Sequence, residues 1–456
     1  MLHETRELLQ GSVPKRVALH LGAADGAWMT FADRPQLQQV LMNLLLNAVE
    51  SYEDQSGDVR VTVLEAQDQL GGKIRTSPFA GLPAVDEGPD AFLARIPWAT
   101  AFAREVGLGD ELVSPTPGSA AVWWHGLHRL PEGLLLGMPT DVVAMARSKL
   151  LTWPGKIRAA TEVLRPRTSI EGDSIGAYVR ARFGDQVHER LVDPLVGSIY
   201  AADTDQFSLA AVPQIAELAR GNRSVLVAAR RRPAAPAATG PVFYAPAGGL
   251  GRLIEAAAAA VTARGGTIRT GAPCTTLEAD GSGWRVDGDP ADAVVLACPS
   301  SQAARLLPDG EAAAGLRGIP AADVVMVTVA VPSATWPERL QGLSGYLVPK
   351  PVQHLVTAVS FGSQKWQQWA SDGQVVLRIS LGRDGLPVLA MSDDRLVAAA
   401  IDETSAHLGV QLAPTAVRVT PWQRAFPQYR PHHAAKVAAI TAALPAGVVL
   451  AGASYH

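Results

Sequence analysis

Short apolar runs between glycines and polar residues predict most strands of this chain. Val59 to Leu64 is a β-branched run typical of a buried strand, and Glu65 follows at its carboxyl end. Three later runs, at 323–331, 374–381 and 416–420, alternate or stay apolar like strands of an antiparallel sheet. The mixture of buried and alternating runs favours an α/β fold with an antiparallel part.

Helical periodicity with proline and glycine breaks extends from Pro97 to about Arg220. Within it, 168–184 has a capped start and apolar spacing. Gly248, Gly249 and Gly251 could be mistaken for a phosphate loop, but we interpret them as a tight turn that starts an alanine-rich helix. The segment 228–241 is a low-complexity link whose three arginines are most simply a solvated loop.

Composition narrows the class of protein. The chain has 456 residues, 48% hydrophobic and 18% charged, which suits a soluble globular protein of two or three domains. A net charge of −3 argues against a nucleic-acid surface. Two cysteines, Cys274 and Cys298, cannot make a disulfide framework, and no Cys/His cluster has metal spacing, so we expect a cytoplasmic protein without a structural metal.

Membrane contact is expected to be peripheral at most. The first residues lack the apolar core of a secretory signal, and the longest apolar runs are too short to span a bilayer. Trp123, Trp124 and the segment 130–138 would be costly to expose fully, so peripheral contact there remains open.

The candidate chemistry centres on Glu65 and the residues after it. A carboxylate at a strand tip can accept hydrogen bonds from the vicinal hydroxyls of an adenosine ribose. Gly71 and Gly72 let the backbone approach a pyrophosphate, and Lys73 and Arg75 add positive charge. A strand followed by a glycine turn without a ligand is the alternative for this stretch alone.

The motif continues through Asp-Glu-Gly-Pro-Asp-Ala-Phe-Leu-Ala-Arg at 86–95, and the whole segment 63–97 resembles the flavin-dependent porphyrinogen oxidases of haem synthesis. Two later segments, 188–203 and 422–433, also resemble this family. The resemblance implies an α/β fold of the two-dinucleotide-domain flavin oxidase type. It also implies FAD as cofactor, dioxygen as oxidant, and coproporphyrinogen or protoporphyrinogen as substrate, with a weak preference for coproporphyrinogen.

The resemblance also places residues. It puts Gly88, Pro89, Asp90 and the backbone of Cys274 near the cofactor and makes Arg95 the candidate partner of a substrate propionate, with a surface salt bridge as the alternative for Arg95. It implies no acid or base catalyst, because aromatisation drives the reaction.

A further pair, His432 and His433, invites a metal interpretation. We discount it, because adjacent side chains on an extended loop point apart and no third ligand is evident.

The resemblance divides the chain into four parts. Residues 61–96, 241–300 and 441–456 form a discontinuous FAD-binding domain, 97–240 a helical domain, and 301–440 a substrate domain with an antiparallel sheet. Residues 1–60 instead resemble the first nucleotide-site helix of sensor histidine kinases, with Asn43 and Asn47 four apart on one helix face.

Two parts of the oxidase pattern are not found. No G-x-G-x-x-G turn precedes Glu65. The nearest glycine-containing stretch has Asp25 at the place where the phosphate would sit. The second missing part is a glycine-rich turn, because the sequence stops at the last strand before it. Each lost charge-assisted hydrogen bond is worth about 1.5–3 kcal/mol, so weak or absent flavin binding is expected. Three alternatives remain: an ATP-binding kinase fragment, a flavin oxidase for amines or carotenoids, and an inactive spliced chain.

Overall fold

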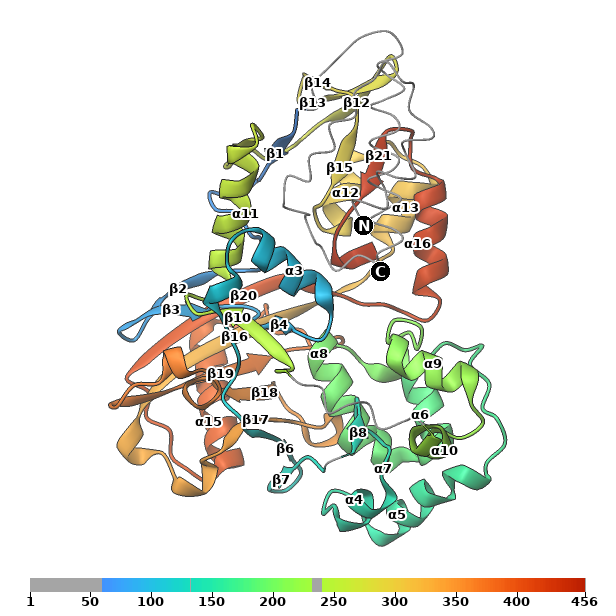
Figure 1. Cartoon of the computed structure of the whole chain (residues 1–456), viewed down its shortest axis with the longest axis vertical. Coiled ribbons are helices and arrows are strands. Elements are labelled where there is room, and N and C mark those ends of the chain that lie inside the picture. Colours follow the sequence, from blue (N-terminus) through green and yellow to red (C-terminus); the bar gives the residue numbers. More distant parts are fainter. Residues whose placement is uncertain (1–59, 132, 232–239, 456) are drawn as a thin grey trace.

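The computed structural model describes residues 60–131, 133–231 and 240–455. Parallel strand pairs form its upper part in Figure 1. Strand β1 (Thr62–Leu64) pairs with β11 (Thr267–Arg269), and β15 (Val294–Leu296) pairs with β21 (Val448–Leu450). The same region contains a three-stranded meander and four helices: β12 (Leu277–Asp280), β13 (Gly283–Val286), β14 (Asp289–Ala291), α11 (Gly251–Ala263), α12 (Ser300–Leu306), α13 (Glu311–Arg317) and α16 (His433–Ala442).

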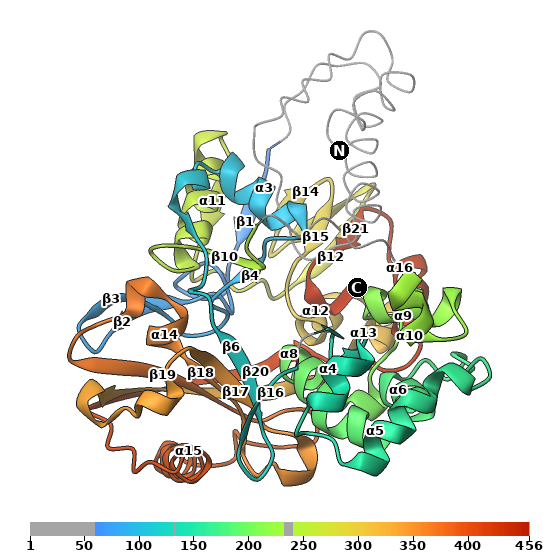
Figure 2. The same ribbon diagram turned by 60° about the horizontal axis from the view of Figure 1, so that its bottom comes forward.

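A seven-stranded sheet forms the lower left of Figure 1 and is seen below the upper region in Figure 2. Its strand order is β20-β16-β19-β18-β17-β6-β7, and every neighbouring pair is antiparallel except β17 and β6. The strands are β6 (Ser119–Trp123), β7 (Leu127–Arg129), β16 (Ala321–Pro332), β17 (Leu343–Leu347), β18 (Val356–Phe361), β19 (Gln374–Leu381) and β20 (Ala416–Pro427). Helix α15 (Asp393–Leu408) packs on this sheet through Leu396, Ala400 and Leu408.

The three antiparallel strands predicted from apolar runs are therefore confirmed as the neighbours β19, β16 and β20. Strand β20 extends beyond the predicted end to Pro427, so Trp422 lies in a strand. The pairing with β16 shifts register between Ala322 and Val324, which marks a bulge opposite residues 423–425.

Helices gather in the lobe at the lower right of Figure 1. They are α4 (Val142–Arg147), α5 (Trp153–Ala160), α6 (Ile175–Phe183), α7 (Asp185–Val187), α8 (Ser198–Tyr200), α9 (Pro213–Gly221) and α10 (Val225–Arg231). The predicted cap is confirmed, since Ser174 accepts the N–H of Ala177 at the start of α6. Between α7 and α8 the chain forms a π-helix over His188–Gly197, with Pro194 inside it. Proline lacks an N–H, so regular α-helical hydrogen bonding is interrupted there.

The expectation of a helical segment over 97–240 needs correction. Strands β6 and β7 from this segment complete the large sheet, because β6 pairs with β17. Alanine in 119–123 favours a helix locally, but pairing along a sheet edge outweighs that weak preference. The short strands nearby are β4 (Phe92–Leu93), β5 (Leu112–Val113), β8 (Leu134–Leu135), β9 (Met138–Pro139) and β10 (Phe243–Pro246), and β10 joins β4 to β5.

The remaining elements are the hairpin β2 (Thr76–Phe79) and β3 (Leu82–Asp86), helix α3 (Pro97–Glu105) and the one-turn helix α14 (Gly362–Lys365). The start of the predicted low-complexity link, up to Arg231, is the end of α10 rather than a loop. The kinase-like residues Asn43 and Asn47 lie outside the described residues.

The structure bears on two points that the sequence raised, the possible membrane contact at 123–138 and the setting of the histidine pair. Trp123 and Trp124 are half-buried against the sheet core and the lobe core, and Met138 is fully buried, so these residues do not form an exposed apolar surface. His433 begins α16 and is buried, with Nε2 3.1 Å from the carbonyl of Ser454, so the histidine pair does not lie on an extended loop. Among the described residues no helix is long and apolar enough to cross a membrane.

Candidate functional site

Glu65 lies at the carboxyl end of β1, beside the loop after β11. Its N–H donates to the carbonyl of Arg269, and its carbonyl accepts the N–H of Ala272, each at 2.9 Å. The half-buried carboxylate accepts the N–H of Gln67 through Oε1 at 2.9 Å, while Oε2 has no hydrogen-bond partner in the described part of the chain. Glu65 therefore lies beside Ala272, and one carboxylate oxygen is free to accept a hydroxyl.

The glycine turn after Glu65 is held close to α11. Gly71 has a φ of +103°, and a Cβ there would lie 2.7 Å from the carbonyl of Ile74 and 3.0 Å from Cγ1 of Ile254. Gly72 also has a positive φ, of +56°. The turn therefore excludes side chains, as predicted, because neither position suits an L-residue. The close neighbour that the structure shows is a helix of the same chain.

Lys73 bridges this turn to the large sheet. Its ammonium donates to the carbonyl oxygens of Arg424, at 3.1 Å, and Ala425, at 2.5 Å, within the β20 bulge. Burial lowers the pKa of Lys73, and the nearby Arg424 adds to the effect. The Lys73 charge is thus engaged by backbone carbonyls, and its role in the structure is to fix the turn against β20.

Arg75 keeps an open donor near Glu65. Its NH2 donates to Oε1 of Gln67 at 2.7 Å, and the guanidinium lies 5.7 Å from the centre of the Trp422 ring. The buried Nε atom has no hydrogen-bond partner in the described chain. Gln67 joins Glu65 to Arg75 through two hydrogen bonds. The three residues therefore leave one acceptor, Glu65 Oε2, and one cationic donor, Arg75 Nε, without a partner in the described chain. Such a pair fits the ribose hydroxyls and phosphate of a dinucleotide.

The start of α11 is capped by the chain itself. Asp86 accepts the N–H of Leu250 at 2.9 Å and the hydroxyl of Thr76 at 2.5 Å, and Thr76 accepts the N–H of Gly251 at 2.9 Å. Burial raises the pKa of Asp86 against the opposing effect of these hydrogen bonds. The glycine turn at 248–251 is therefore a helix start with occupied N–H groups, as interpreted from the sequence.

Gly88 and Asp90 lock the next part of the motif onto the sheet. A Cβ on Gly88 would lie 2.5 Å from the carbonyl of Lys73, so only glycine fits. Arg378 donates to the carbonyl of Gly88 and lies 3.0 Å from the Asp90 carboxylate. Lys365 reaches both carboxylate oxygens at 2.9 Å, and Trp366 Nε1 donates at 3.1 Å.

The carboxylate of Asp90 is consequently occupied by protein groups. Burial opposes its charge, yet Lys365 and Arg378 hold the pKa of Asp90 well below its usual range. In the structure Asp90 thus anchors the motif. Pro89 is exposed beside it.

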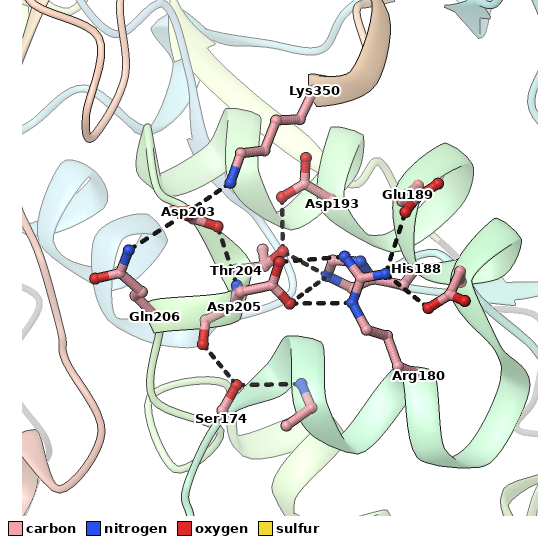
Figure 3. A network of polar contacts seen from close by, with 12 residues as sticks. Ser174, Arg180, His188, Glu189, Asp193, Asp203, Thr204, Asp205, Gln206 and Lys350 are labelled. Atoms are coloured by element: carbon pink, nitrogen blue, oxygen red, sulfur yellow. Dashed lines mark hydrogen bonds and ion pairs between the residues drawn. The ribbon is translucent and has the colours of Figure 1, made fainter.

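A second polar network holds the lobe beside the sheet (Figure 3). Thr204 donates to Asp193 at 2.6 Å, so its oxygen accepts Nε2–H of His188 at 2.8 Å. The other ring nitrogen of His188, Nδ1, is buried without a partner in the described chain, which fits a neutral imidazole. Burial, assisted by Arg180, lowers the pKa of His188.

Asp193 is the buried end of this network and belongs to the π-helix. Arg383 binds its two carboxylate oxygens at 3.0 and 3.2 Å and also donates to the carbonyl of Ala202. Burial raises the pKa of Asp193, but the guanidinium outweighs it, and the pKa lies below the ordinary value. At the rim, Lys350 reaches Asp203 at 2.7 Å (Figure 3). These contacts fix the segment 188–203, which resembles the porphyrinogen oxidases, relative to the sheet.

Two predicted residues lie apart from these contacts. Arg95 is exposed between β4 and α3, and no hydrogen bond or ion pair joins its side chain to another described residue. Cys274 is half-buried, and its thiol lies 3.6 Å from the carbonyl of Thr276. Burial, with Asp287, raises the pKa of Cys274, which leaves the thiol protonated. The described chain contains no group of three residues arranged to hold a metal ion.

Sequence reasoning missed the sheet residues that complete the site. Lys365, Trp366 and Arg378 come from α14, its end and β19, far along the chain from Asp90. Their one sequence signal is that Arg378 is a charged residue within an otherwise apolar strand run, where a cation requires a buried partner.

Parallel strand pairs with a carboxylate at a strand tip are typical of dinucleotide-binding folds, and comparison with known proteins gives the class of this protein. The chain belongs to the family described as flavin containing amine oxidoreductase, whose model matches residues 54–456. The predicted α/β flavin oxidase fold and the predicted cofactor, FAD, are thereby confirmed.

Particular relatives are coproporphyrinogen III oxidases. The chain is 36% identical to the enzyme of Mycobacterium tuberculosis, over 87% of each chain. It is 28% identical to that of Bacillus subtilis, over 87% of this chain and 88% of the relative. A solved structure of a putative protoporphyrinogen oxidase from Exiguobacterium sp. 255-15 has a TM-score of 0.76 at 29% identity, with 91% of each chain covered. Cyclohexylamine oxidase from Brevibacterium oxydans IH-35A, at 18% identity and a TM-score of 0.60 over 91% of each chain, shares the fold.

Proposed function

We propose that this chain oxidises a porphyrinogen to the porphyrin, with coproporphyrinogen III preferred to protoporphyrinogen IX. The observation that supports this most is the 36% identity to coproporphyrinogen III oxidase over 87% of the chain. The relation to amine oxidases is by contrast one of fold. When bound, FAD supplies the two-electron acceptor for each of three oxidation steps and passes the electrons to dioxygen.

The residues of the chain hold and orient rather than transfer protons. Glu65 Oε2 would accept a ribose hydroxyl, and Arg75 would donate Nε–H to a phosphate oxygen. Gly71 and Gly72 would leave room for the backbone to follow the cofactor. Lys73, Gly88 and Asp90 keep this segment fixed on the sheet. Positioning of this kind lowers the barrier because the reacting groups are already aligned.

The central test uses the purified full chain. Because weak flavin binding is expected from the sequence, FAD is added in excess, and we expect porphyrin fluorescence when coproporphyrinogen III is added in air. The fluorescence should not appear without dioxygen, and protoporphyrinogen IX should react more slowly. A chain that binds flavin and oxidises an amine but neither porphyrinogen would contradict the proposal.

Arg95 is the proposed partner of a substrate propionate. Its exposed guanidinium has no carboxylate partner in the described chain, so it is free to bind a carboxylate bidentately. Replacing it as Arg95→Gln should raise KM about tenfold with little change in kcat, since a charge-assisted hydrogen bond is worth about 1.5–3 kcal/mol. Arg104→Gln, an exposed arginine on neighbouring α3, is the matched control and should leave KM unchanged. An equal KM for Arg95→Gln and wild type would remove Arg95 from the site.

Peripheral membrane contact is proposed at a different surface from the one expected. Four strongly exposed apolar side chains lie on α4, α5 and the turn after it, and they form the α5 patch: Val143 (56%), Trp153 (71%), Ile157 (63%) and Leu164 (77%). Trp153 and Ile157 share a helix face, and the ammonium of Lys156 lies 4.9 Å from the Trp153 ring. Exposed Arg147 and Lys149 add positive charge beside the patch. An aromatic and aliphatic surface with a basic rim fits the interface of an anionic bilayer.

Sedimentation with vesicles tests this contact. The chain should bind phosphatidylglycerol-containing vesicles more strongly than pure phosphatidylcholine vesicles, and Trp153→Ser with Ile157→Ser should abolish binding. Val417→Ser removes an exposed apolar side chain from β20 and serves as the control. Vesicle binding that survives the double substitution would place the contact elsewhere.

A further inference from the structure

A separate cavity lies at the far edge of the seven-stranded sheet from the cofactor segment. It has a volume of about 320 Å³ and is lined by Ala121, Leu127, Arg129, Arg339, Leu340, Leu343, His407 and Leu408. We call it the edge cavity. Lys73 and Trp422 connect the cofactor segment to β20 at one edge of the sheet, whereas β6 and β7 lie at the other. Neighbouring strands are spaced by about 4.8 Å, so roughly 25–30 Å of sheet separates the two sites.

Two cations line the edge cavity without a counter-charge. Arg129 ends β7 and donates to the hydroxyl of Ser119, and Arg339 donates to the carbonyls of Leu408 and Gly409. No carboxylate within the described chain lies at ion-pair distance from either guanidinium. Each guanidinium has five N–H donors, so both retain donors for a ligand.

His407 supplies a third donor. It is 8% exposed, and its Nδ1 lies 3.2 Å from the hydroxyl of Tyr346. Burial lowers the pKa of His407 to about 4, with His354 contributing, so the ring is neutral at pH 7. We assign the Tyr346 hydroxyl as the donor to Nδ1 in this hydrogen bond. The proton of the neutral ring is therefore on Nε2, which has no partner within the described chain.

The ring of His407 is held in place by its neighbour on β6. The Trp123 ring lies 4.1 Å from it, centre to centre, and Trp123 Nε1 donates to the His407 carbonyl at 3.1 Å. The donor on Nε2 is thus fixed rather than free to rotate away. A fixed donor loses little entropy when a ligand binds.

Part of the wall of the edge cavity is apolar. Leu340, Leu343 and Leu408 are each at most 5% exposed, and Ala121 and Leu127 of the sheet complete the surface. A purely inorganic anion would leave this surface without a partner. An apolar molecule would instead leave the two guanidinium groups and the imidazole N–H without an acceptor.

We propose that the edge cavity binds a small amphipathic monocarboxylate. Its carboxylate lies between Arg129, Arg339 and Nε2 of His407, and its hydrocarbon part lies against the leucines. The volume is at the lower end of the range for small-molecule sites, which suits a medium-chain acid and excludes a macrocycle.

Calorimetric titration of the flavin-loaded full chain tests the proposal. Octanoate should bind at near-neutral pH, and octylamine should not. Acetate should bind at least about tenfold more weakly, because it lacks the methylenes that the leucines would cover. If octylamine bound as tightly as octanoate, the cavity would be a nonspecific apolar surface. If inorganic phosphate or acetate bound as tightly as octanoate, the cavity would be a simple anion site. Either this result or equally tight binding of octylamine would overturn the proposal.

Variants locate the binding. Arg129→Gln with Arg339→Gln should weaken octanoate at least about tenfold, since it removes both charge-assisted contacts. Arg305→Gln is the matched control, because Arg305 is also exposed and, among the residues that the structure describes, donates a hydrogen bond to Gln302 alone. His407→Phe keeps a ring against Trp123 but removes the N–H, and should weaken octanoate by about threefold. Unchanged octanoate affinity in the double arginine variant, with its melting temperature preserved, would contradict the assignment.

Discussion

Arg378 and Arg383 stand on one stretch of chain, within β19 and just beyond its end, but they hold opposite sides of the molecule. Arg378 binds Asp90 and the carbonyl of Gly88, and so fixes the cofactor segment. Arg383 binds Asp193 and the carbonyl of Ala202, and so fixes the helical lobe. One strand of the sheet therefore sets where both sides of the proposed site lie.

The two pairs differ in how the charges are shared. Asp90 neutralises two cations, Arg378 and Lys365, and also accepts from Trp366. Asp193 neutralises Arg383 alone, with Thr204 as its neutral donor. Asp90 is thus the member that the cofactor side cannot lose, because two cations depend on it. On the lobe side Asp193 and Arg383 depend on each other equally. This difference can be tested by removing one charge at a time.

Asp90→Asn should have the largest effect, because it leaves two cations without a counter-charge. Breaking a buried ion pair by removing one member costs about 3–5 kcal/mol, and we expect the upper part of this range in urea unfolding. Asp309→Asn is the control, since Asp309 is 94% exposed and its pair with Arg317 contributes little. A loss equal to that of the control would mean that the Asp90 cluster does not anchor the motif.

The arginine variants should lose less free energy of unfolding than Asp90→Asn, and the two losses should differ. Arg383→Met isolates the Asp193 carboxylate and should cost about 3 kcal/mol, at the lower end for a broken buried pair. Arg378→Met leaves Asp90 with Lys365, so its cost should be about half of that, because one charge partner is retained. Urea unfolding of the two variants measures the difference. Equal losses would show that Lys365 does not compensate Asp90.

The two sides should also respond differently to pH, because His188 adjoins the Asp193 network and none of the described histidines contacts Asp90. The pKa of His188 is lowered in the fold, so the unfolded chain takes up a proton first as pH falls below about 6.5. Stability is therefore lost as pH falls from 7 towards 5, by at most about 1.4 kcal/mol per pH unit for this group.

His188→Gln should lessen that decline in free energies of unfolding measured between pH 7 and 5, leaving the part that is due to His407. Asp90→Asn should keep the slope there and change it below about pH 4, because a depressed carboxylate pKa contributes stability above its unfolded value and loses it in acid. His432→Gln, at an exposed position, is the control. An unchanged slope for His188→Gln would mean that His188 does not couple the lobe to pH.

The sequence predicted well what depends on neighbouring residues. The strand-tip carboxylate, the glycine turn and the cap of α6 are local features, and each follows from residue type and spacing. The same reasoning located β16, β19 and the start of β20, because their apolar runs are long. It placed Lys73 near the cofactor because Lys73 adds positive charge beside a glycine turn that can approach a pyrophosphate.

The parts that sequence could not supply depend on distant contacts. Lys73 meets carbonyls more than three hundred positions away, and the partners of Asp90 come from α14 and β19. Strand β6 is recognisable only through its pairing with β17, since its alanines favour a helix. Charge-bearing residues in apolar runs, such as Arg378, are the one signal that such contacts exist, and they do not name the partner.

The smallest effect is expected at Glu65, where the cofactor side can be probed without disturbing Asp90. Glu65→Gln retains an oxygen that can accept a ribose hydroxyl but loses the charge, and hydrogen bonds to ions are roughly twice as strong as neutral ones. We expect flavin affinity to fall about fivefold, a loss of about 1 kcal/mol, with unchanged urea unfolding of the flavin-free chain. Fluorescence titration of FAD into that chain measures the affinity. Asp68→Asn, an exposed carboxylate in the same loop, should leave it unchanged. Equal FAD affinities for Glu65→Gln and Asp68→Asn would show that the strand-tip carboxylate does not contact the cofactor, and the anchoring by Arg378 would then stand without the proposed ribose contact.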